Sequence, residues 1–127
     1  MQSGTGEFGS IDLASGRFEP VCFLQGYGRG VAFVGDHAVI AVSSPRENRS
    51  FEDLVLGERL AREGVGPQCH LAVVNLATGD IEHRLVIRGP VRELYDVVGL
   101  PGLISPAALR SEELQFFVKP GASAELL

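Results

Sequence analysis

The sequence predicts an all-β fold of antiparallel four-stranded sheets that pack like the blades of a β-propeller, with one short helical insertion. Three observations predict it. Short apolar runs alternate with glycine-containing turns, one stretch of sequence recurs 63 residues later, and the 127 residues include 16 glycines and 7 prolines. Glycine and proline at this frequency suit a chain with many tight turns.

Three segments have the pattern of β-hairpins. Each pairs two short apolar runs across a glycine-containing turn: residues 8–13 with 17–24, residues 30–34 with 38–42, and residues 70–76 with 80–87. The second pair is apolar on both faces, which predicts strands buried on both sides. Residues 94–98 and 114–118 are two further strand candidates.

Residues 44–69 interrupt the β pattern and contain a predicted helix. Residues 51–63 carry apolar side chains at roughly helical spacing, namely Phe51, Leu54, Val55 and Ala61. Ser50 and Asp53 resemble a weak capping box at the start of this helix. No neighbouring strand pattern accounts for burial of the apolar helix face, so the insertion is a candidate contact arm.

An internal repeat is the most informative feature. Residues 11–19 match residues 74–82, with Leu, Ala, Gly and Glu identical at corresponding positions. About 64 residues after the run 31–35 stands the similar run 95–99. Without the helical insertion the period falls near 40 residues, which is the length of a four-stranded propeller blade.

The repeat divides the single domain 1–127 into about two blades' worth of structure. Residues 30–88 are predicted to form one complete blade with the insertion 44–69. Residues 8–25 would be the outer half of the preceding blade, and residues 92–118 the start of the next. Propellers close with four to eight blades, so we expect a homo-oligomer, or missing blades on another chain. A generic small β-sandwich or barrel is the alternative.

Composition limits the function further. The chain has 45% hydrophobic residues and a formal net charge of −5, from 11 basic and 16 acidic residues. This charge and the lack of a basic tract argue against nucleic-acid binding. No apolar run is long enough to span a membrane, and no signal-peptide core begins the chain. Together with only two cysteines, Cys22 and Cys69, this predicts a cytoplasmic protein with reduced thiols.

Several stretches resemble a known family. They are residues 28–36, the Ser-Pro-Arg-Glu sequence at 44–47, residues 76–80, and the Glu-Leu-Tyr-Asp-Val sequence at 93–97. Together they resemble the C-terminal part of TIGR03032, an uncharacterised bacterial propeller-like family related to the DUF4915 domain. The resemblance covers most of residues 8–105 and implies the fold, but no activity. The family's domain is considerably longer, which implies that its N-terminal blades lie outside this chain.

Six residues are candidates for ligand binding. Arg29, Arg46 and Glu47 stand at strand ends or loop starts, where the central channel of a propeller is lined. Arg29 precedes an inner strand, so its guanidinium could bind an anionic ligand, while the alternative is a salt bridge between blades. The other three, Glu93, Tyr95 and Asp96, begin the following inner strand.

The two carboxylates among them could hold a metal or act as a general base, as in lactonase-type propellers, or they could form structural hydrogen bonds between blades. Cys69 and His70 adjoin each other, but neighbours along a strand point to opposite faces and do not make a nucleophile–base pair. The sequence contains no P-loop, GxSxG or HExxH motif, and no spacing of Cys and His matches a zinc site.

These observations favour a non-enzymatic propeller-like module that assembles with itself or with a partner. A metal-dependent hydrolase, lactonase or lyase of the propeller type is one alternative. A module that binds an anionic small molecule or glycan is the other. We therefore predict no catalytic residues, no metal and no cofactor.

Overall fold

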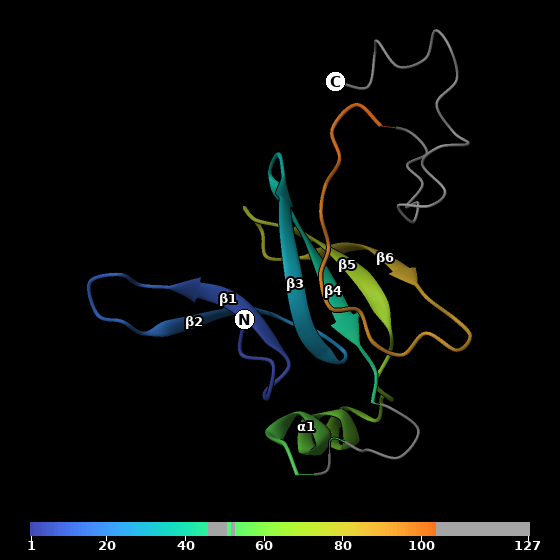
Figure 1. Ribbon diagram of the computed structural model, residues 1–127. Coiled ribbons are helices and arrows are strands. Elements are labelled where there is room, and N and C mark those ends of the chain that lie inside the picture. The colour runs from blue at the N-terminus through green and yellow to red at the C-terminus, as the bar shows by residue number, and fades with distance from the viewer. Residues whose placement is uncertain (46–50, 52, 104–127) are drawn as a thin grey trace, which may run out of the picture.

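The computed structural model describes residues 1–45, 51 and 53–103. Six strands and one helix follow one another in the order β1, β2, β3, β4, α1, β5, β6 (Figure 1). Their bounds are β1 Glu7–Ile11, β2 Phe18–Phe23, β3 Tyr27–Val34, β4 His37–Ser43, α1 Val55–Glu63, β5 His70–Asn75 and β6 Ile81–Val86. The predicted all-β fold with a single helical insertion is confirmed.

The central unit is a four-stranded antiparallel sheet in the order β3-β4-β5-β6. Each strand pairs with the next along the chain, and α1 with its flanking loops connects β4 to β5. The register places Ile40 of β4 opposite Ala72 of β5. This is the meander that a single propeller blade would have, while the division of the chain into blades remains a prediction.

The second sheet is the β1–β2 hairpin, and it repeats the β5–β6 hairpin. The pairing Ile11↔Phe18 in the first corresponds, 63 residues on, to Val74↔Ile81 in the second. Both hairpins turn through the same hydrogen bonds. Gly16 N donates to Asp12 O at 2.7 Å, and the corresponding bond joins Gly79 N to Asn75 O at 2.8 Å. The sequence repeat is therefore also a structural repeat.

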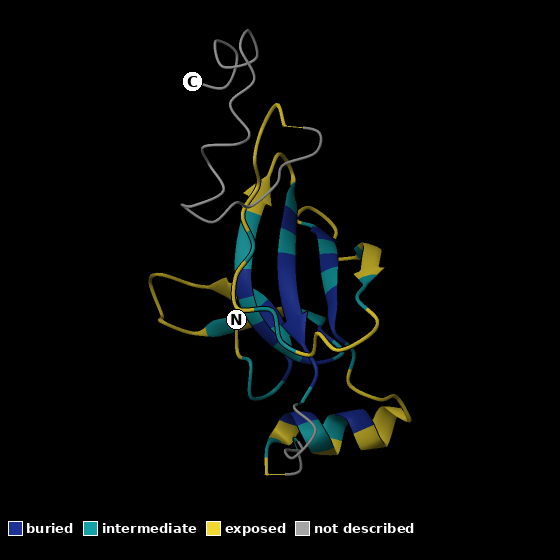
Figure 2. Cartoon of the chain, turned by 45° about the vertical axis from the view of Figure 1, so that its right-hand side comes forward, coloured by how far each residue is buried: buried dark blue, intermediate teal, exposed yellow. Residues whose placement is uncertain are grey.

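The core lies between these two sheets. Phe8 of β1 is buried with residues of the larger sheet, and Cys22 of β2 packs against the same cluster. The other members of this cluster are Leu24, Ala38, Ile40, Val42, Ala72 and Val74. Figure 2 shows this buried stripe along the middle strands and the exposed β1–β2 hairpin tip that projects away from it. The hairpin thus stacks at its base on one face of the larger sheet.

The helix differs from its prediction. It begins at Val55, and its N-cap residue Leu54 is extended and makes no side-chain cap hydrogen bond. The expected cap partner Ser50 lies outside the described residues. Leu56 and Leu60 are the buried helix residues, whereas Val55 and Ala61 are exposed, so the predicted apolar face was wrong.

Contacts within the chain hold this helix, which removes the reason for regarding it as a contact arm. The backbone N–H of Leu56 donates to Gly4 O at 2.9 Å. The guanidinium of Arg59 pairs with Glu7 at 2.9 Å and lies 4.1 Å from the ring centroid of Phe23. The apolar helix face is therefore covered by the N-terminal loop and β2. No described helix has the length and hydropathy that crossing a bilayer would need.

Residues 94–98 do not form the expected strand. Within residues 88–100 the structure has no strand, and this segment runs beside β3, as the orange trace of Figure 1 shows. The prediction failed because the segment is held by the buried serines at the end of β4 and pairs with no neighbouring strand. The candidate strand 114–118 lies outside the described residues.

Candidate functional site

An arginine–glutamate pair lies where β3 meets the segment that follows β6. Arg29 stands at the irregularity between Gly28 and Val31, where the β3–β4 register shifts. One of its terminal nitrogens lies 3.2 Å from Oε1 of Glu93, and the two side chains are 31% and 17% exposed. Tyr95 donates its hydroxyl hydrogen to the other carboxylate oxygen at 2.9 Å. Glu93 therefore receives a hydrogen bond on each oxygen.

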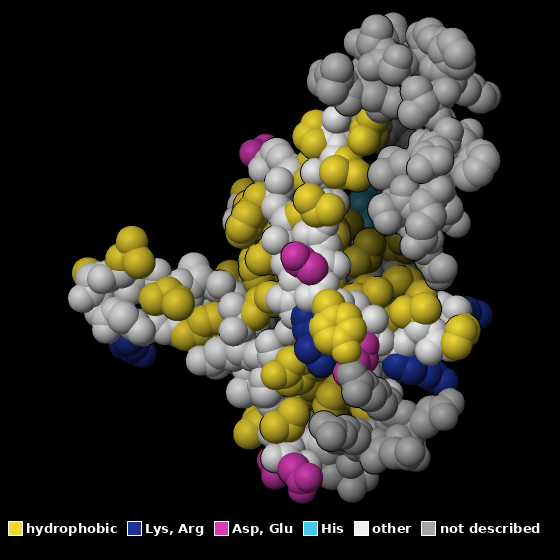
Figure 3. All heavy atoms as spheres, in the orientation of Figure 1, with side chains coloured by type: hydrophobic (Ala, Val, Ile, Leu, Met, Phe, Trp, Pro, Cys, Tyr) yellow, Lys and Arg dark blue, Asp and Glu magenta, His cyan; other side chains and the backbone are white. Residues whose placement is uncertain are grey.

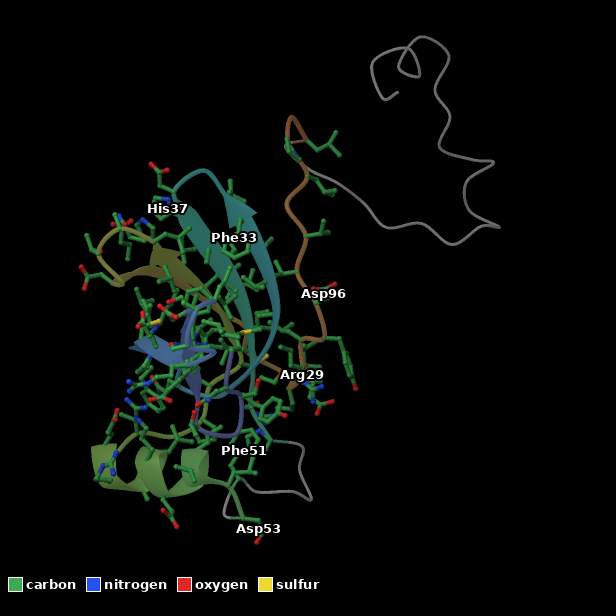
Figure 4. The ribbon with its side chains drawn as sticks, turned by 90° about the vertical axis from the view of Figure 1, so that its left-hand side faces the viewer. Arg29, Phe33, His37, Phe51, Asp53 and Asp96 are labelled. Carbon is green, nitrogen blue, oxygen red and sulfur yellow. The ribbon has the colours of Figure 1, made fainter. Side chains whose placement is uncertain are left out.

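Aromatic rings surround the guanidinium. The Arg29 Cζ atom lies 5.3 Å from the ring centroid of Tyr27 and 5.0 Å from that of Tyr95, both within the range of a cation–π interaction. Tyr27 in turn stacks on Phe51, with 6.1 Å between the ring centroids. Figure 4 shows Arg29 between Phe51 and Asp96, on the side of the sheet along which the 92–103 segment runs. The positive charge of the Arg29 guanidinium is therefore stabilised by the carboxylate of Glu93 and by the rings of Tyr27 and Tyr95.

Two buried serines at the end of β4 fix the segment. Ser43 Oγ accepts the backbone N–H of Leu94 at 3.0 Å and lies 3.2 Å from the carbonyl oxygen of the same residue, to which it donates. The backbone N–H of Ser44 donates to Arg92 O at 2.9 Å. These bonds place Glu93 within reach of Arg29. We predicted the serines only as the start of a polar loop.

The structure brings together three of the six predicted ligand residues, Arg29, Glu93 and Tyr95. Asp96 lies next to Gly30 on β3, and its carboxylate accepts the adjacent N–H of Val97 at 2.8 Å. Arg46 and Glu47 lie outside the described residues. Arg29 forms a salt bridge with Glu93. A salt bridge was the alternative to ligand binding that the sequence left open for this residue.

Tyr27, Phe51 and Gly30 also belong to this site, but they were not predicted from the sequence. Tyr27 stands two positions before Arg29, and residues two apart on a regular strand share one face, which was an available signal. Nothing in the sequence indicated that Phe51, which belongs to the insertion 44–69, would stack on Tyr27. Among the described residues, no group of three or more His, Cys, Asp and Glu side chains surrounds a possible metal position.

The Cys69–His70 pair is buried at the start of β5. His70 is 0% exposed, and its Nδ1 lies 3.0 Å from the carbonyl oxygen of Gln68, so Nδ1 carries the hydrogen. Its Nε2 is buried without a hydrogen-bond partner. Burial lowers the pKa of His70 and raises the pKa of the Cys69 thiol. Both shifts favour the neutral form of the side chain. A reactive cysteine needs the opposite shift, because a lowered pKa produces the thiolate that acts as the nucleophile.

These features define an all-β protein with a repeated β-hairpin and an ion pair between β3 and the segment that follows β6. The family model described as "Domain of unknown function (DUF4915)" matches residues 1–109. The chain belongs to this family, as the resemblance implied. No curated protein and no solved structure matches the chain.

Proposed function

We propose that this chain is a non-enzymatic, propeller-like module that assembles with further copies of itself. The single observation that carries the proposal is the structural repeat: β1–β2 shares its turn and the pairing next to the turn with β5–β6. Within the described residues, however, β1–β2 forms a two-stranded sheet, whereas β5–β6 belongs to a four-stranded one. Sheet repeats of this kind bury their faces by stacking on neighbouring repeats. A partial repeat therefore leaves surface for a neighbour.

Exposed apolar side chains support this proposal. Ile11 and Leu13 on the first hairpin are 60% and 96% exposed, Phe33 near the tip of β3 is 66% exposed, and Leu85 on β6 is 63% exposed. Figure 3 shows hydrophobic side chains on the projecting β1–β2 hairpin. Single exposed apolar residues are ordinary on protein surfaces. Ile11 and Leu13 belong to the hairpin that repeats β5–β6 without its neighbouring strands, which makes their exposure relevant to assembly.

The test is the solution mass of the 127-residue chain, measured by size exclusion with light scattering over a range of concentrations. We expect a mass of two or more chains that persists at ordinary salt, because the buried surface would be largely apolar. A monomeric mass at every concentration would overturn the proposal. A sharp monomer peak would then direct attention to the Arg29 site.

The surroundings of Arg29 favour a second candidate, the binding of a small anionic group. The Nε atom of Arg29 is buried and has no hydrogen-bond partner, and two tyrosine rings flank the guanidinium. An anion would have to compete with Glu93, which already pairs with the same group. For this reason the site ranks below self-assembly. A metal-dependent hydrolase gains no comparable support, because the described carboxylates are not gathered.

Thermal unfolding with added inorganic phosphate or glucuronate tests this second candidate. If either anion binds at Arg29, the unfolding temperature of the wild type rises with its concentration and that of Arg29→Ala does not. Circular dichroism of Arg29→Ala should retain the β signal of the wild type. Equal responses of the two proteins would exclude Arg29 as the binding group.

A further inference from the structure

We infer that two copies of this chain join β1 to β1 across a twofold axis, so that their hairpins form one continuous antiparallel sheet in the order β2-β1-β1-β2. The inference rests on the proposed function, because it specifies how self-assembly takes place. It is carried by an exposed edge of β1 whose backbone groups and side chains are complementary to a second copy of the same edge.

The backbone of β1 directs hydrogen-bonding groups away from β2. Asp12 donates its N–H to Arg17 O at 2.9 Å, toward β2. Backbone groups of successive residues point alternately to the two edges of a strand, so those of Ile11 and Gly9 face away from β2. Among the described residues, this outer edge of β1 is paired only at Glu7.

The equivalent edge of the other hairpin is occupied. Ile11 corresponds to Val74, which pairs with Ala38 of β4. Leu76, the counterpart of Leu13, donates its N–H across the same edge at 2.9 Å. Val74 is 0% and Leu76 45% exposed, whereas Ile11 is 60% and Leu13 96% exposed. The outer edge of β1 therefore has the geometry that accepts a strand, and its apolar side chains remain exposed.

The middle of β1 lacks the features that usually protect an exposed strand edge. Residues 8–11 read Phe-Gly-Ser-Ile, without proline or charge. The other outer strands contain such features, because Pro20 lies on β2 and β6 has exposed charges at Glu82 and Arg84. The β1–β2 hairpin also projects from the larger sheet, which leaves room for a second copy to approach (Figure 2).

One register uses all of the outward-facing groups. When Ile11 lies opposite Ile11 of the second copy, Leu13 of each chain lies opposite Gly9 of the other. The two Ile11 residues then exchange both of their backbone hydrogen bonds, and every other contact occurs twice, as in any isologous interface. Pairing ends at Gly9, because the edge at Glu7 is already bonded to Gln2.

The side chains fit this register. Phe18 lies opposite Ile11 within each hairpin, so the two copies together form an apolar row of four side chains. In the next row, Asp12 lies opposite Ser10 of the second copy, which pairs in turn with Glu19 of its own hairpin. No like charges stand directly opposite each other across the junction, an arrangement that would destabilise it. This self-complementarity favours a second copy as the occupant of the edge.

A single cysteine tests the register. Ile11→Cys places two thiols at directly opposite positions of the paired strands. The Cα atoms of such a hydrogen-bonded pair are about 5.5 Å apart, which is within the range that a disulfide spans. After mild oxidation, Ile11→Cys should give a covalent dimer on a non-reducing gel.

Ser10→Cys and Ala14→Cys are the matched controls, because both residues are exposed on the same hairpin and neither lies opposite its own equivalent. The wild type gives the background from its free thiols, Cys22 and Cys69. A higher dimer yield from Ser10→Cys than from Ile11→Cys would place the twofold axis elsewhere and overturn the register. Equal yields from Ile11→Cys and Ala14→Cys would indicate chance collisions and would overturn it too.

Opposite charges at position 11 give a second, independent test. Ile11→Asp and Ile11→Lys each bring like charges face to face in a twofold junction, so each variant alone should have the mass of a single chain. An equimolar mixture should recover the mass of two chains, because an aspartate then meets a lysine. A mixture that contains only single chains would overturn the contact between the two copies of residue 11.

The matched control is Val55→Asp, which puts the same charge on a helix residue that is 58% exposed and should keep the wild-type mass. Circular dichroism confirms that all three variants fold.

The results separate this inference from the proposed function. If the wild type and Ile11→Asp assemble alike, self-assembly stands and the junction between the two β1 strands is wrong. If the wild type is a monomer at every concentration, both are wrong. If the wild type assembles, Ile11→Asp does not, and Ile11→Cys forms the covalent dimer, both are supported.

Discussion

At the scale of single residues, glycine at position 30 decides whether the segment after β6 can lie against β3. A β-carbon built on Gly30 would stand 2.5 Å from Cα of Asp96 and 2.7 Å from the backbone nitrogen of Val97. These are backbone atoms, so a side-chain rotation cannot relieve the clash. The bare backbone of Gly30 therefore permits the close approach that brings Glu93 to Arg29.

Gly30→Ala should destabilise the protein by about 1–3 kcal/mol, the usual range for overpacking a tight contact. The measurement is the denaturant midpoint of unfolding. Gly66→Ala is the matched control, because no described atom lies within 4 Å of a β-carbon there. Equal midpoints for the two variants would mean that residues 95–97 do not pack against β3 in solution.

His70 should make stability depend on pH below neutrality. Burial lowers the pKa of the folded-state imidazole below that of the unfolded chain, which is about 6.5. The unfolded state then binds more protons as pH falls through this value, so the free energy of unfolding decreases until the folded-state pKa is reached. At pH 8 both states carry a neutral imidazole and this effect is absent.

The check is urea unfolding of the wild type and His70→Phe between pH 5 and pH 8. We expect part of the loss of stability in acid to disappear in His70→Phe, which has no titrating ring at this buried position. Comparison at pH 8 gives the packing effect of the substitution by itself. The same acid dependence in both proteins would show that His70 is not the responsible group.

At the scale of elements, the two hairpins share a turn but differ in what surrounds it. Gly16 and Gly79 occupy equivalent turn positions with φ of 69° and 80°, a backbone region that favours glycine. A β-carbon at Gly79 would lie 2.9 Å from Cγ1 of Val21, whereas one at Gly16 meets no described atom within 4 Å. The first sheet thus contacts the turn of the second.

Alanine substitutions at Gly16 and Gly79 distinguish the cost of backbone strain in the turn from the cost of a close side-chain contact. Gly16→Ala should cost about 1–2 kcal/mol from backbone strain alone. Gly79→Ala should cost more, because the contact with Val21 adds to the same strain. Thermal unfolding of both variants measures the difference. A larger effect at Gly16 would contradict the stacking of β2 near this turn.

At the scale of the whole molecule, self-assembly would tie folding to concentration. Partners that bind only the folded chain stabilise it by mass action, so the unfolding temperature rises with protein concentration. We expect this rise for the wild type and a much smaller one for Ile11→Asp, because this substitution places a carboxylate on an apolar residue of the first hairpin that is 60% exposed. A wild-type unfolding temperature that stays constant over a wide concentration series would speak against assembly of the native state.

The local fold followed from the sequence to a large extent. The three hairpins, their turns and the repeat of residues 11–19 at 74–82 were visible in the pattern, because glycine turns and apolar runs depend on neighbours along the chain. The helix was predicted in the right place with the wrong face. Leu56 and Leu60 are buried by the N-terminal loop and β2, which the local pattern does not contain.

The candidate site was predicted in part for the same reason. Arg29 and Glu93 were chosen separately, from their places at strand starts, but the 64-residue offset that joins them was not used to pair them. Tyr27 and Phe51 were missed because their stacking joins β3 to the helical insertion, two segments that are not neighbours in the sequence. The strand expected at 94–98 is absent, since Ser43 and Ser44 bind the backbone of that segment and hold it beside β3.

The sequence by itself determined the all-β class, the hairpin turns and the repeat, because these depend on residue types and spacing within a few positions. Only the tertiary structure decided which side chains surround Arg29, which helix face is buried, and which apolar residues of the hairpins are exposed. Those outcomes depend on contacts between segments that are far apart in the sequence, such as Arg29 and Glu93, which are 64 residues apart. Burial and close approach between such segments, as at Gly30 and Asp96, arise only when the sheets stack.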